Sequence, residues 1–276
     1  MITPDPALRI EPSRGWQTVD LHELWQHRDL LFYLVWRDIR VSYSNTGLGV
    51  FWVLLQPLST AIIITFVLGL FAKVPTGGLP YPVLVLSGLV PWMYFQNAVA
   101  TACSSMVANS YLLSKVYFPR LIIPVVPLLV GLVDAGVLLT ALLGVALVFR
   151  LSLAWTWLFL PVALLAAAGL ALGAGLWLSA LNVQFRDVGR LVPVLLQIGL
   201  YASPIFYPVS LVPANWRWLY DLNPVVGLVE AMRWAVFSFE RFPLGAFSWT
   251  CLAAVLLIVT GAFVFRHMEE NAADVV

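Results

Sequence analysis

Six long apolar stretches constrain this chain more than any other feature. They cover residues 50–72, 82–108, 121–149, 155–181, 191–211 and 246–265. The hydrocarbon core of a bilayer is about 30 Å thick, so a helix needs roughly 20 consecutive apolar residues to cross it. Hydrophobic residues make up 61% of the chain and charged residues only 11%, whereas soluble domains carry about 25% charged residues. The pattern predicts an all-α integral membrane protein with six transmembrane helices.

The positive charges predict how these spans are oriented. Six spans place both termini on one side of the membrane, and each of the 15 Lys and Arg residues can then be assigned to a side. Five of them fall on the side opposite the termini: Lys73, Arg150, Arg217, Arg233 and Arg241. The other ten lie on the side of the termini. Because Lys and Arg are enriched in cytoplasmic loops, we expect a multi-pass protein with both termini in the cytoplasm.

The chain divides into three predicted parts. In residues 1–45, a cytoplasmic N-terminal segment, aromatic residues such as Trp25 and Trp36 are interleaved with charged residues such as Arg28 and Asp38. This mixture favours an amphipathic helix lying in the cytoplasmic membrane interface. A soluble helix packed on a partner is the alternative. Residues 46–266 form the six-span membrane domain, and residues 267–276 form a cytoplasmic tail.

A short apolar segment lies between the fifth and sixth spans. Residues 225–237 are too few to cross a bilayer, and they follow a stretch broken by Pro204, Pro208, Pro213 and Pro224. We interpret this region as a re-entrant hairpin on the periplasmic side, with a helix lying flat on the outer surface as the alternative. Irregular backbone at membrane depth is tolerated only where protein covers it or water lines it. The hairpin therefore suggests a pore mouth or cavity, and hence transport.

Several kinds of chemistry are absent from the sequence. A phosphate loop for ATP hydrolysis ends in Gly-Lys, but the two lysines, Lys73 and Lys115, follow Ala72 and Ser114. The sequence also contains no metal-binding helix motif, no serine nucleophile elbow and no sign of nucleic-acid binding. We therefore expect no enzyme activity, no metal site and no cofactor bound by this chain, and any energy must come from a partner.

Two features inside the spans call for structural interpretations. Asp134 lies midway along the third span, where an ionisable group is expensive. We expect it to hydrogen-bond a neighbouring helix or to be protonated, and contact with a substrate is the alternative. In the fourth span, Gly169, Gly173 and Gly175 form small-residue faces with Ala171. Such faces allow close helix packing, so we assign them to architecture.

Four blocks of sequence, in order, resemble the polysaccharide-exporting permeases of the type 2 ABC transporters. The first covers residues 36–43 (WRDIRVSY) and continues through Thr46-Gly47-Leu48-Gly49 to Trp52. The others are residues 115–120 (KVYFPR) with Pro124, residues 182–188 (NVQFRDV) leading into residues 201–208 (YASPIFYP), and Asn223-Pro224. The resemblance covers nearly the whole chain. Ser42 and Ser44 depart from the basic character expected after the first arginines, which makes contact with anionic lipid there less secure.

The resemblance implies a subunit of an exporter in the bacterial inner membrane. In this family, two copies of the permease and two ATP-binding cassette subunits, which hold ATP and Mg, export a lipid-linked polysaccharide. Family frequency favours O antigen, while capsule and teichoic acid are other cargoes. Membrane lipids are the remaining expected partner. Two alternatives remain: a type 2 permease for a small hydrophobic drug or lipid, and a membrane-embedded enzyme of glycolipid synthesis.

Three groups of site residues follow from this hypothesis. A glycan pore needs aromatic rings for sugar C–H faces together with uncharged polar groups, and the conduit candidates are Trp52, Gln56, Ser59, Gln197, Tyr201, Ser203, Phe206 and Tyr207. Their alternative role is contact with lipid or neighbouring helices. The expected coupling residues for the ATP-binding subunit are Arg37, Arg40, Tyr111, Lys115, Tyr117, Arg120, Arg186 and Asp187. Their alternative role is topological anchoring. The expected outer gate comprises Asn223, Glu230 and Arg233, of which the last two are spaced to form an ion pair along one helix face.

Overall fold

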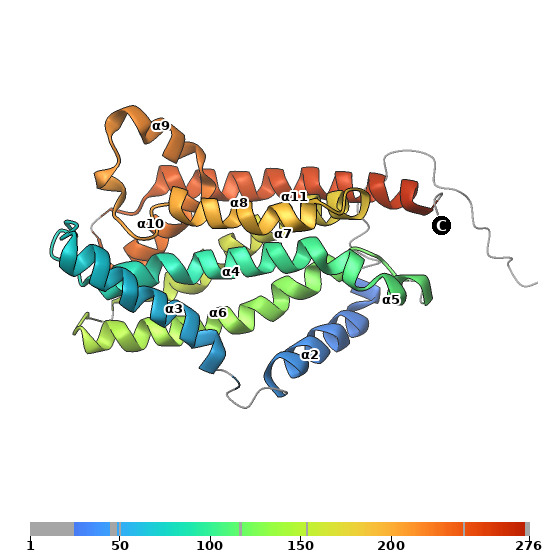
Figure 1. The fold of residues 1–276 in the computed structure, drawn as a ribbon, viewed down its shortest axis with the longest axis horizontal. Helices are drawn as coiled ribbons and strands as arrows, with labels where there is room; N and C mark the ends of the chain where they lie inside the picture. The colour runs from blue at the N-terminus through green and yellow to red at the C-terminus, as the bar shows by residue number, and fades with distance from the viewer. Residues whose placement is uncertain are drawn as a thin grey trace, which may run out of the picture.

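The structure is a computed structural model, and it describes residues 25–44, 49, 51–115, 118–152, 154–239 and 241–273. Figure 1 shows an elongated bundle whose helices run along the long axis of the molecule. The described residues form helices and connecting turns, with no strand among them. The first 24 residues and Tyr117 lie outside the described part, so the structure leaves the start of the predicted interfacial helix untested.

The helices follow the apolar stretches closely. Their bounds are α2 Arg28–Ser44, α3 Phe51–Ile64, η1 Thr65–Phe71, α4 Tyr81–Ala108, α5 Ser110–Lys115, α6 Ile122–Val148, η2 Trp155–Phe159, α7 Leu160–Gln184, α8 Val188–Ala202, η3 Val209–Leu211, α9 Ala214–Leu222, α10 Pro224–Phe237 and α11 Leu244–Ala273. The π-helix η1 continues α3, and the 3₁₀-helix η2 leads into α7. Among the described residues, five helices are long and apolar enough to cross a membrane: Phe51–Phe71, Tyr81–Ala108, Ile122–Val148, Trp155–Gln184 and Leu244–Met268.

The fifth expected span differs from the prediction. Its helix, α8, has only 15 residues, which corresponds to about 22 Å at 1.5 Å per residue. It ends at Ala202, and Ser203 adopts an extended conformation at φ −101° and ψ 152°. The cause is Pro204, because a residue before proline is disfavoured in the α region. Residues 203–208 therefore leave the helix and form a loop where the apolar pattern predicted a continuous span.

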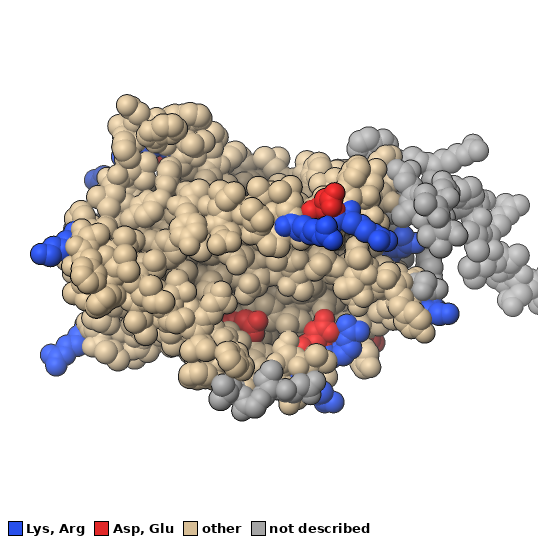
Figure 2. Space-filling model, in the orientation of Figure 1, with Lys and Arg blue, Asp and Glu red and all other residues tan. Residues whose placement is uncertain are grey.

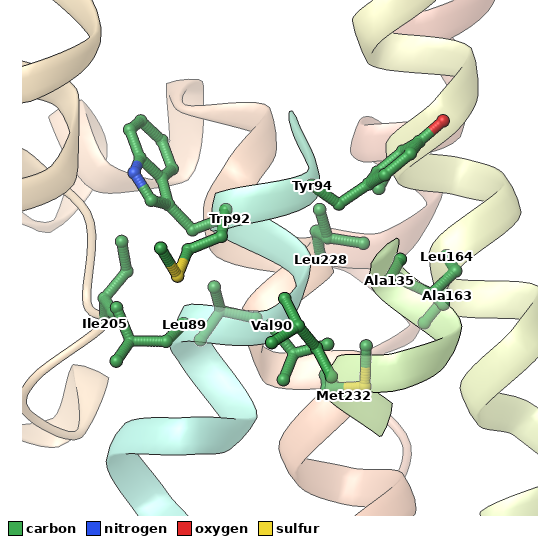
Figure 3. Close-up of a cluster of buried hydrophobic side chains, with 14 of the residues drawn as sticks. Leu89, Val90, Trp92, Tyr94, Ala135, Ala163, Leu164, Ile205, Leu228 and Met232 are labelled. Carbon is green, nitrogen blue, oxygen red and sulfur yellow. The ribbon is translucent and has the colours of Figure 1, made fainter. Parts of the chain in front are cut away.

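The core of the bundle is built around α4. This helix packs against α6, α7, α8 and α10, and Figure 3 shows how side chains from these elements meet. The labelled residues come from α4, α6, α7, α10 and the 203–208 loop: Leu89, Val90, Trp92, Tyr94, Ala135, Ala163, Leu164, Leu228, Met232 and Ile205. All are buried in the structure. A short helix such as α10 is thus part of the core, with both of its ends covered.

Helix α7 packs closely on α11, as the glycine pattern predicted. A Cβ atom added at Gly173 would lie 2.5 Å from Leu257 Cβ and 2.6 Å from the Leu257 backbone carbon. One added at Gly169 would lie 3.3 Å from Ala254 Cβ, also on α11. Gly175 faces the other way, where its added Cβ would lie 2.9 Å from Ala102 Cβ on α4. The structural role assigned to these glycines is confirmed.

The bundle has two distinct ends. We call the end that carries η1, η2, α9 and α10 the hairpin end, and the end that carries α5 and the turn between α7 and α8 the α5 end. Figure 1 shows the C-terminal end of α11 at the α5 end, together with the start of α2. In Figure 2, Lys and Arg gather toward both ends of the long axis, and the visible surface between them carries few charges. This surface has the character of one that contacts lipid.

Candidate functional site

The helices α3 and α8 both pack on α4. All three helices carry exposed side chains that do not belong to the hydrophobic core. On α4, the exposed residues at the middle and the α5 end include Asn97, Thr101 and Ser104. Their spacing of four and then three residues places them on one side of the helix. We call these three residues the polar stripe, and the surface formed by α3, α4 and α8 the conduit face.

Contact between the polar stripe and lipid is unfavourable in free energy. Asn97 lies close to the middle of a helix of 28 residues that is long and apolar enough to cross a membrane, so a membrane-spanning α4 would hold it far from either surface. Its amide makes no side-chain hydrogen bond within the described part of the chain, whereas the Ser104 hydroxyl donates to the Thr101 carbonyl oxygen at 3.1 Å. Moving an unpaired amide from water into an apolar medium costs about 2–7 kcal/mol. The stripe is therefore typical of a surface that faces water, a polar ligand or another protein chain.

Four of the expected conduit residues lie exposed on α3 and α8. Trp52 is 54% exposed and Tyr201 is 60% exposed, and Gln56 and Gln197 are also exposed. Ser59 is partly exposed, and its hydroxyl donates to the Gln56 carbonyl oxygen at 2.9 Å. Together with the polar stripe, these residues make a face of aromatic rings and uncharged polar groups. Such a face can contact sugar rings through stacking and hydrogen bonds.

The other three expected conduit residues lie in the loop after α8. Ser203 is fully buried and Phe206 is 4% exposed, so neither has surface available for a passing substrate. The Ser203 hydroxyl instead accepts a hydrogen bond from Asn223 Nδ2 at 3.0 Å. Only Tyr207, which is half-buried, retains an accessible side. We assign Ser203 and Phe206 to packing.

The loop after α8 is held by donors from two other helices. Arg233 on α10 donates to the carbonyl oxygens of Ile205 at 2.9 Å and Tyr207 at 3.1 Å. Tyr81 at the start of α4 donates its hydroxyl to the Phe206 carbonyl oxygen at 2.6 Å. Three consecutive carbonyls are thus satisfied by side chains. Gly88 allows the close approach, because a Cβ there would lie 2.8 Å from the Ile205 carbonyl oxygen. We call this arrangement the Arg233 latch.

The expected ion pair between Glu230 and Arg233 is wrong. Within the described residues, no ion pair joins them, and Arg233 uses its Nη atoms for the two loop carbonyls. Burial lowers the Arg233 pKa to about 10, while the charge of Glu230 acts in the opposite direction. The side chain therefore stays protonated at neutral pH. Asn223 contributes differently from the expectation, since its Oδ1 caps α10 by accepting from the Val225 N–H at 3.0 Å.

The α5 end collects the expected coupling residues. Tyr111 and Lys115 are on α5, and the Lys115 Nζ atom lies 5.8 Å from the centre of the Tyr111 ring. Arg120 lies in the turn before α6, and Arg186 and Asp187 lie in the turn between α7 and α8. Figure 2 shows a dense charge cluster of both signs at this end. A charged surface of this kind suits contact with a soluble subunit, which stays a prediction.

The two α2 members of the coupling group make local contacts. Arg37 Nε donates to Asp38 Oδ1 at 2.8 Å, and the Arg40 guanidinium lies 5.7 Å from the centre of the Trp36 ring. The C-terminal end of α2 is tied to the bundle, because the Tyr43 hydroxyl hydrogen-bonds Asp134 on α6. The expectation that Asp134 bonds a neighbouring helix is confirmed. This bond connects α2 with α6, the helix of the third expected span.

Asn182 is a structural residue whose role the sequence analysis missed. It is 5% exposed at the end of α7. Its Nδ2 donates to the Cys103 carbonyl oxygen on α4 at 3.0 Å, and its Oδ1 accepts from the Gly189 N–H at 2.8 Å. It therefore joins α4, α7 and α8 just beside the charged turn. A polar residue in an otherwise apolar stretch was the available signal.

The sequence of this chain is similar to one family model and to several known proteins. The model of the ABC-2 type transporter family matches residues 29–237. The O-antigen export system permease protein RfbA of Myxococcus xanthus is 30% identical over 259 residues, which cover 92% of this chain and 98% of that protein. RfbA of Klebsiella pneumoniae is 26% identical over 258 residues, with coverages of 90% and 95%.

A third relative has a related name. The polysialic acid transport protein KpsM of Escherichia coli is 25% identical over 252 residues, which cover 85% of this chain and 91% of that protein. Each of the three alignments covers at least 85% of this chain. Each therefore includes the polar stripe, the loop after α8 and most of the hairpin end.

Proposed function

This chain belongs to the ABC-2 type transporter family, and on that premise we propose that it is the membrane subunit of an ATP-driven exporter of lipid-linked polysaccharide. The observation that carries the proposal is the conduit face. It combines exposed aromatic rings with uncharged polar groups at membrane depth, including Asn97, which is unsuited to lipid. The names of the relatives, which are permeases for O antigen and polysialic acid, favour a glycan cargo, and we propose O antigen.

The proposed exporter contains two copies of this chain and two ATP-binding subunits. Two conduit faces turned toward each other would enclose a passage and remove their polar groups from lipid. We place the α5 end in the cytoplasm of the inner membrane, where its charged turns contact the ATP-binding subunits, and the hairpin end in the periplasm. The sequence supports this orientation, since ten of the 15 Lys and Arg residues belong to the side of the termini.

In this mechanism the chain itself makes and breaks no bonds. ATP and Mg on the partner subunit drive a motion that the α5-end turns receive. The turn at Arg186 and Asp187 leads directly into α8, and Asn182 joins that turn to α4. A displacement of this turn would therefore be transmitted to α8 and α4, two of the three helices of the conduit face. The Arg233 latch holds the far end of α8, so the passage remains closed there until the helices move.

Deleting this permease tests the proposal directly. We expect the deletion strain to lose its surface polysaccharide and to accumulate the lipid-linked form inside the cell. The wild-type gene should restore export only when supplied with an ATP-binding subunit that can hydrolyse ATP. Surface glycan is measured by immunoblotting and the intracellular form by lipid extraction. Unchanged surface glycan in the deletion strain would contradict the proposal and favour a small hydrophobic substrate.

Making the polar stripe apolar should reduce export. In the variant Asn97→Leu/Thr101→Val/Ser104→Ala, the conduit face loses its hydrogen-bonding groups on α4 but keeps a similar shape. We expect export to fall about tenfold, the equivalent of one or two lost hydrogen bonds to the glycan at about 1 kcal/mol each. Surface glycan is compared at equal protein levels.

The matched control for the stripe is Thr140→Val on α6. Thr140 is also exposed in a membrane helix, and its hydroxyl donates to the Val137 carbonyl oxygen at 2.7 Å. It lies outside the conduit face, so export should stay near wild type. Equal export by the stripe variant and the control would show that the stripe does not contact the glycan.

A further inference from the structure

A cavity of about 400 Å³, broadly open to the surface, lies at the hairpin end between the Tyr207 loop, η3 and α9. Its volume falls within the range of roughly 300–1,000 Å³ that is typical of small-molecule sites. Three aromatic side chains line it, from Tyr207, Trp216 and Tyr220, together with the aliphatic side chains of Leu211 and Leu219. No charged residue is among the lining residues. The cavity is therefore suited to a neutral ligand with apolar faces.

The tyrosine hydroxyls add hydrogen-bonding capacity to this apolar lining. The Tyr207 hydroxyl donates to the Tyr201 carbonyl oxygen at 3.4 Å. The hydroxyls of Tyr207 and Tyr220 also bond each other, and either of the two can be the donor in that pair. In either arrangement the Tyr220 oxygen retains a lone pair that can accept a further hydrogen bond. A ligand hydroxyl can donate to that oxygen while its ring stacks on an aromatic face.

Tyr207 connects the cavity to the end of α8, one of the three helices of the conduit face. Tyr201, which is exposed on α8 at that face, is hydrogen-bonded through its backbone to Tyr207. Tyr207 also belongs to the Arg233 latch through its own carbonyl oxygen. A molecule that leaves the conduit face at Tyr201 therefore meets Tyr207 and then the cavity. This connection, together with the aromatic rings and hydroxyls of the lining, favours the cargo over bulk lipid as the occupant.

We propose that this cavity is a saccharide-binding subsite at the exit of the conduit, which holds a single sugar unit of the glycan against Trp216 and Tyr220. Sugar rings combine C–H faces, which stack on aromatic rings, with hydroxyls that hydrogen-bond. Both chemistries are present here, and a hydrocarbon chain would use only the first. This inference rests on the proposed function, because it assumes that a glycan passes along the conduit face.

A pair of tryptophans on α9 provides a matched test. Trp216 lines the cavity, whereas Trp218 does not. The two side chains are almost equally exposed, at 59% and 61%. In the complete exporter in cells, we expect Trp216→Ala to lower surface glycan at least fivefold, and Trp218→Ala to leave it near wild type. Trp216→Tyr, which retains a stacking ring, should restore most of the export. Equal losses in both alanine variants would overturn the subsite and indicate an interfacial anchoring role.

A second pair tests the cavity without removing an aromatic ring. Leu219→Phe fills the cavity, whereas Leu222→Phe adds the same ring on the same helix outside it. Both leucines are largely exposed, at 46% and 55%, so both variants should fold. We expect only Leu219→Phe to lower export, by about threefold or more. Wild-type export by Leu219→Phe would overturn the proposal even if Trp216→Ala failed to fold.

Direct binding separates a sugar from a lipid and separates this inference from the proposed function. The probe is lipid-free oligosaccharide released by mild acid from the surface glycan of the host strain, added to the purified complex and followed by saturation-transfer NMR. We expect saturation of the probe by wild type and its loss with Leu219→Phe. Binding of the lipid-linked form alone would overturn the saccharide assignment. Loss of surface glycan in the deletion strain, with wild-type export by the cavity variants, would leave the proposed function intact and remove the subsite.

Discussion

Replacing Arg233 with methionine should destabilise the exporter and abolish export. The Ile205 and Tyr207 carbonyl oxygens would lose their donor, and Ile205 is fully buried. Each buried group without a partner costs about 1–3 kcal/mol, so the loss of a donor for two carbonyls should lower the free energy of unfolding by about 2–6 kcal/mol. The 203–208 loop would lose both bonds from Arg233 and keep the bond from Asn223, the N-cap of α10, to Ser203. Thermal unfolding of the purified complex measures the first effect, and surface glycan measures the second.

Two further variants sharpen the Arg233 prediction. Arg233→Lys keeps the charge but offers a compact ammonium in place of a planar fork, so it should restore stability only in part. Arg217→Met, at an exposed position on α9, removes a positive charge from the same end and should behave as wild type. A melting temperature of Arg233→Met equal to that of Arg217→Met would refute the latch.

Adding one methyl group at Gly227 should prevent α10 from docking on α11. The Cβ atom of alanine would lie 2.1 Å from the Ala246 carbonyl oxygen and 2.3 Å from its carbon, both backbone atoms. The helices would have to separate, which breaks the 2.6 Å bond from the Thr250 hydroxyl to the Pro224 carbonyl oxygen. Overpacking of this severity costs about 3 kcal/mol or more. We expect little folded Gly227→Ala protein after extraction, as measured by gel filtration.

Gly136→Ala is the control for this steric effect. A Cβ atom at Gly136 on α6 would meet no atom within 4 Å. Alanine is favoured over glycine in a helix by about 0.5–1 kcal/mol, so this variant should be as stable as wild type or slightly more so. If the two alanine variants yielded equal amounts of folded protein, the close contact between α10 and α11 would be refuted.

The spans were predictable because length and hydropathy are sufficient to mark them. The second expected span, residues 82–108, corresponds to α4 at Tyr81–Ala108, and residues 121–149 correspond to α6 at Ile122–Val148. The fifth was predicted too long, because the apolar run continues through Pro204 while the helix ends at Ala202. Hydropathy does not detect that break, and the effect of proline on its preceding residue does.

The site was predicted less completely than the spans. The exposed aromatic and amide groups on α3 and α8 were identified, but the polar stripe on α4 was overlooked, although Asn97, Thr101 and Ser104 recur at helical spacing. Spacing along α10 predicted Glu230 as the partner of Arg233. The structure pairs Arg233 with the Ile205 and Tyr207 carbonyls instead. Those contacts depend on a loop that returns to α10 in three dimensions, which spacing within one helix does not reveal.

The shortness of α8 changes the barrier that a hydrophilic cargo must cross. A helix of 15 residues covers about 22 Å of a hydrocarbon layer about 30 Å thick. Beyond Ala202 the chain continues as backbone whose carbonyls are bonded to Arg233 and Tyr81. Along the conduit face, protein thus takes the place of the hydrocarbon core over roughly its outer quarter. In the proposed exporter, a glycan beside α8 would therefore cross a thinner hydrophobic layer than the surrounding membrane presents, and the adjacent lipid would thin to match the short helix.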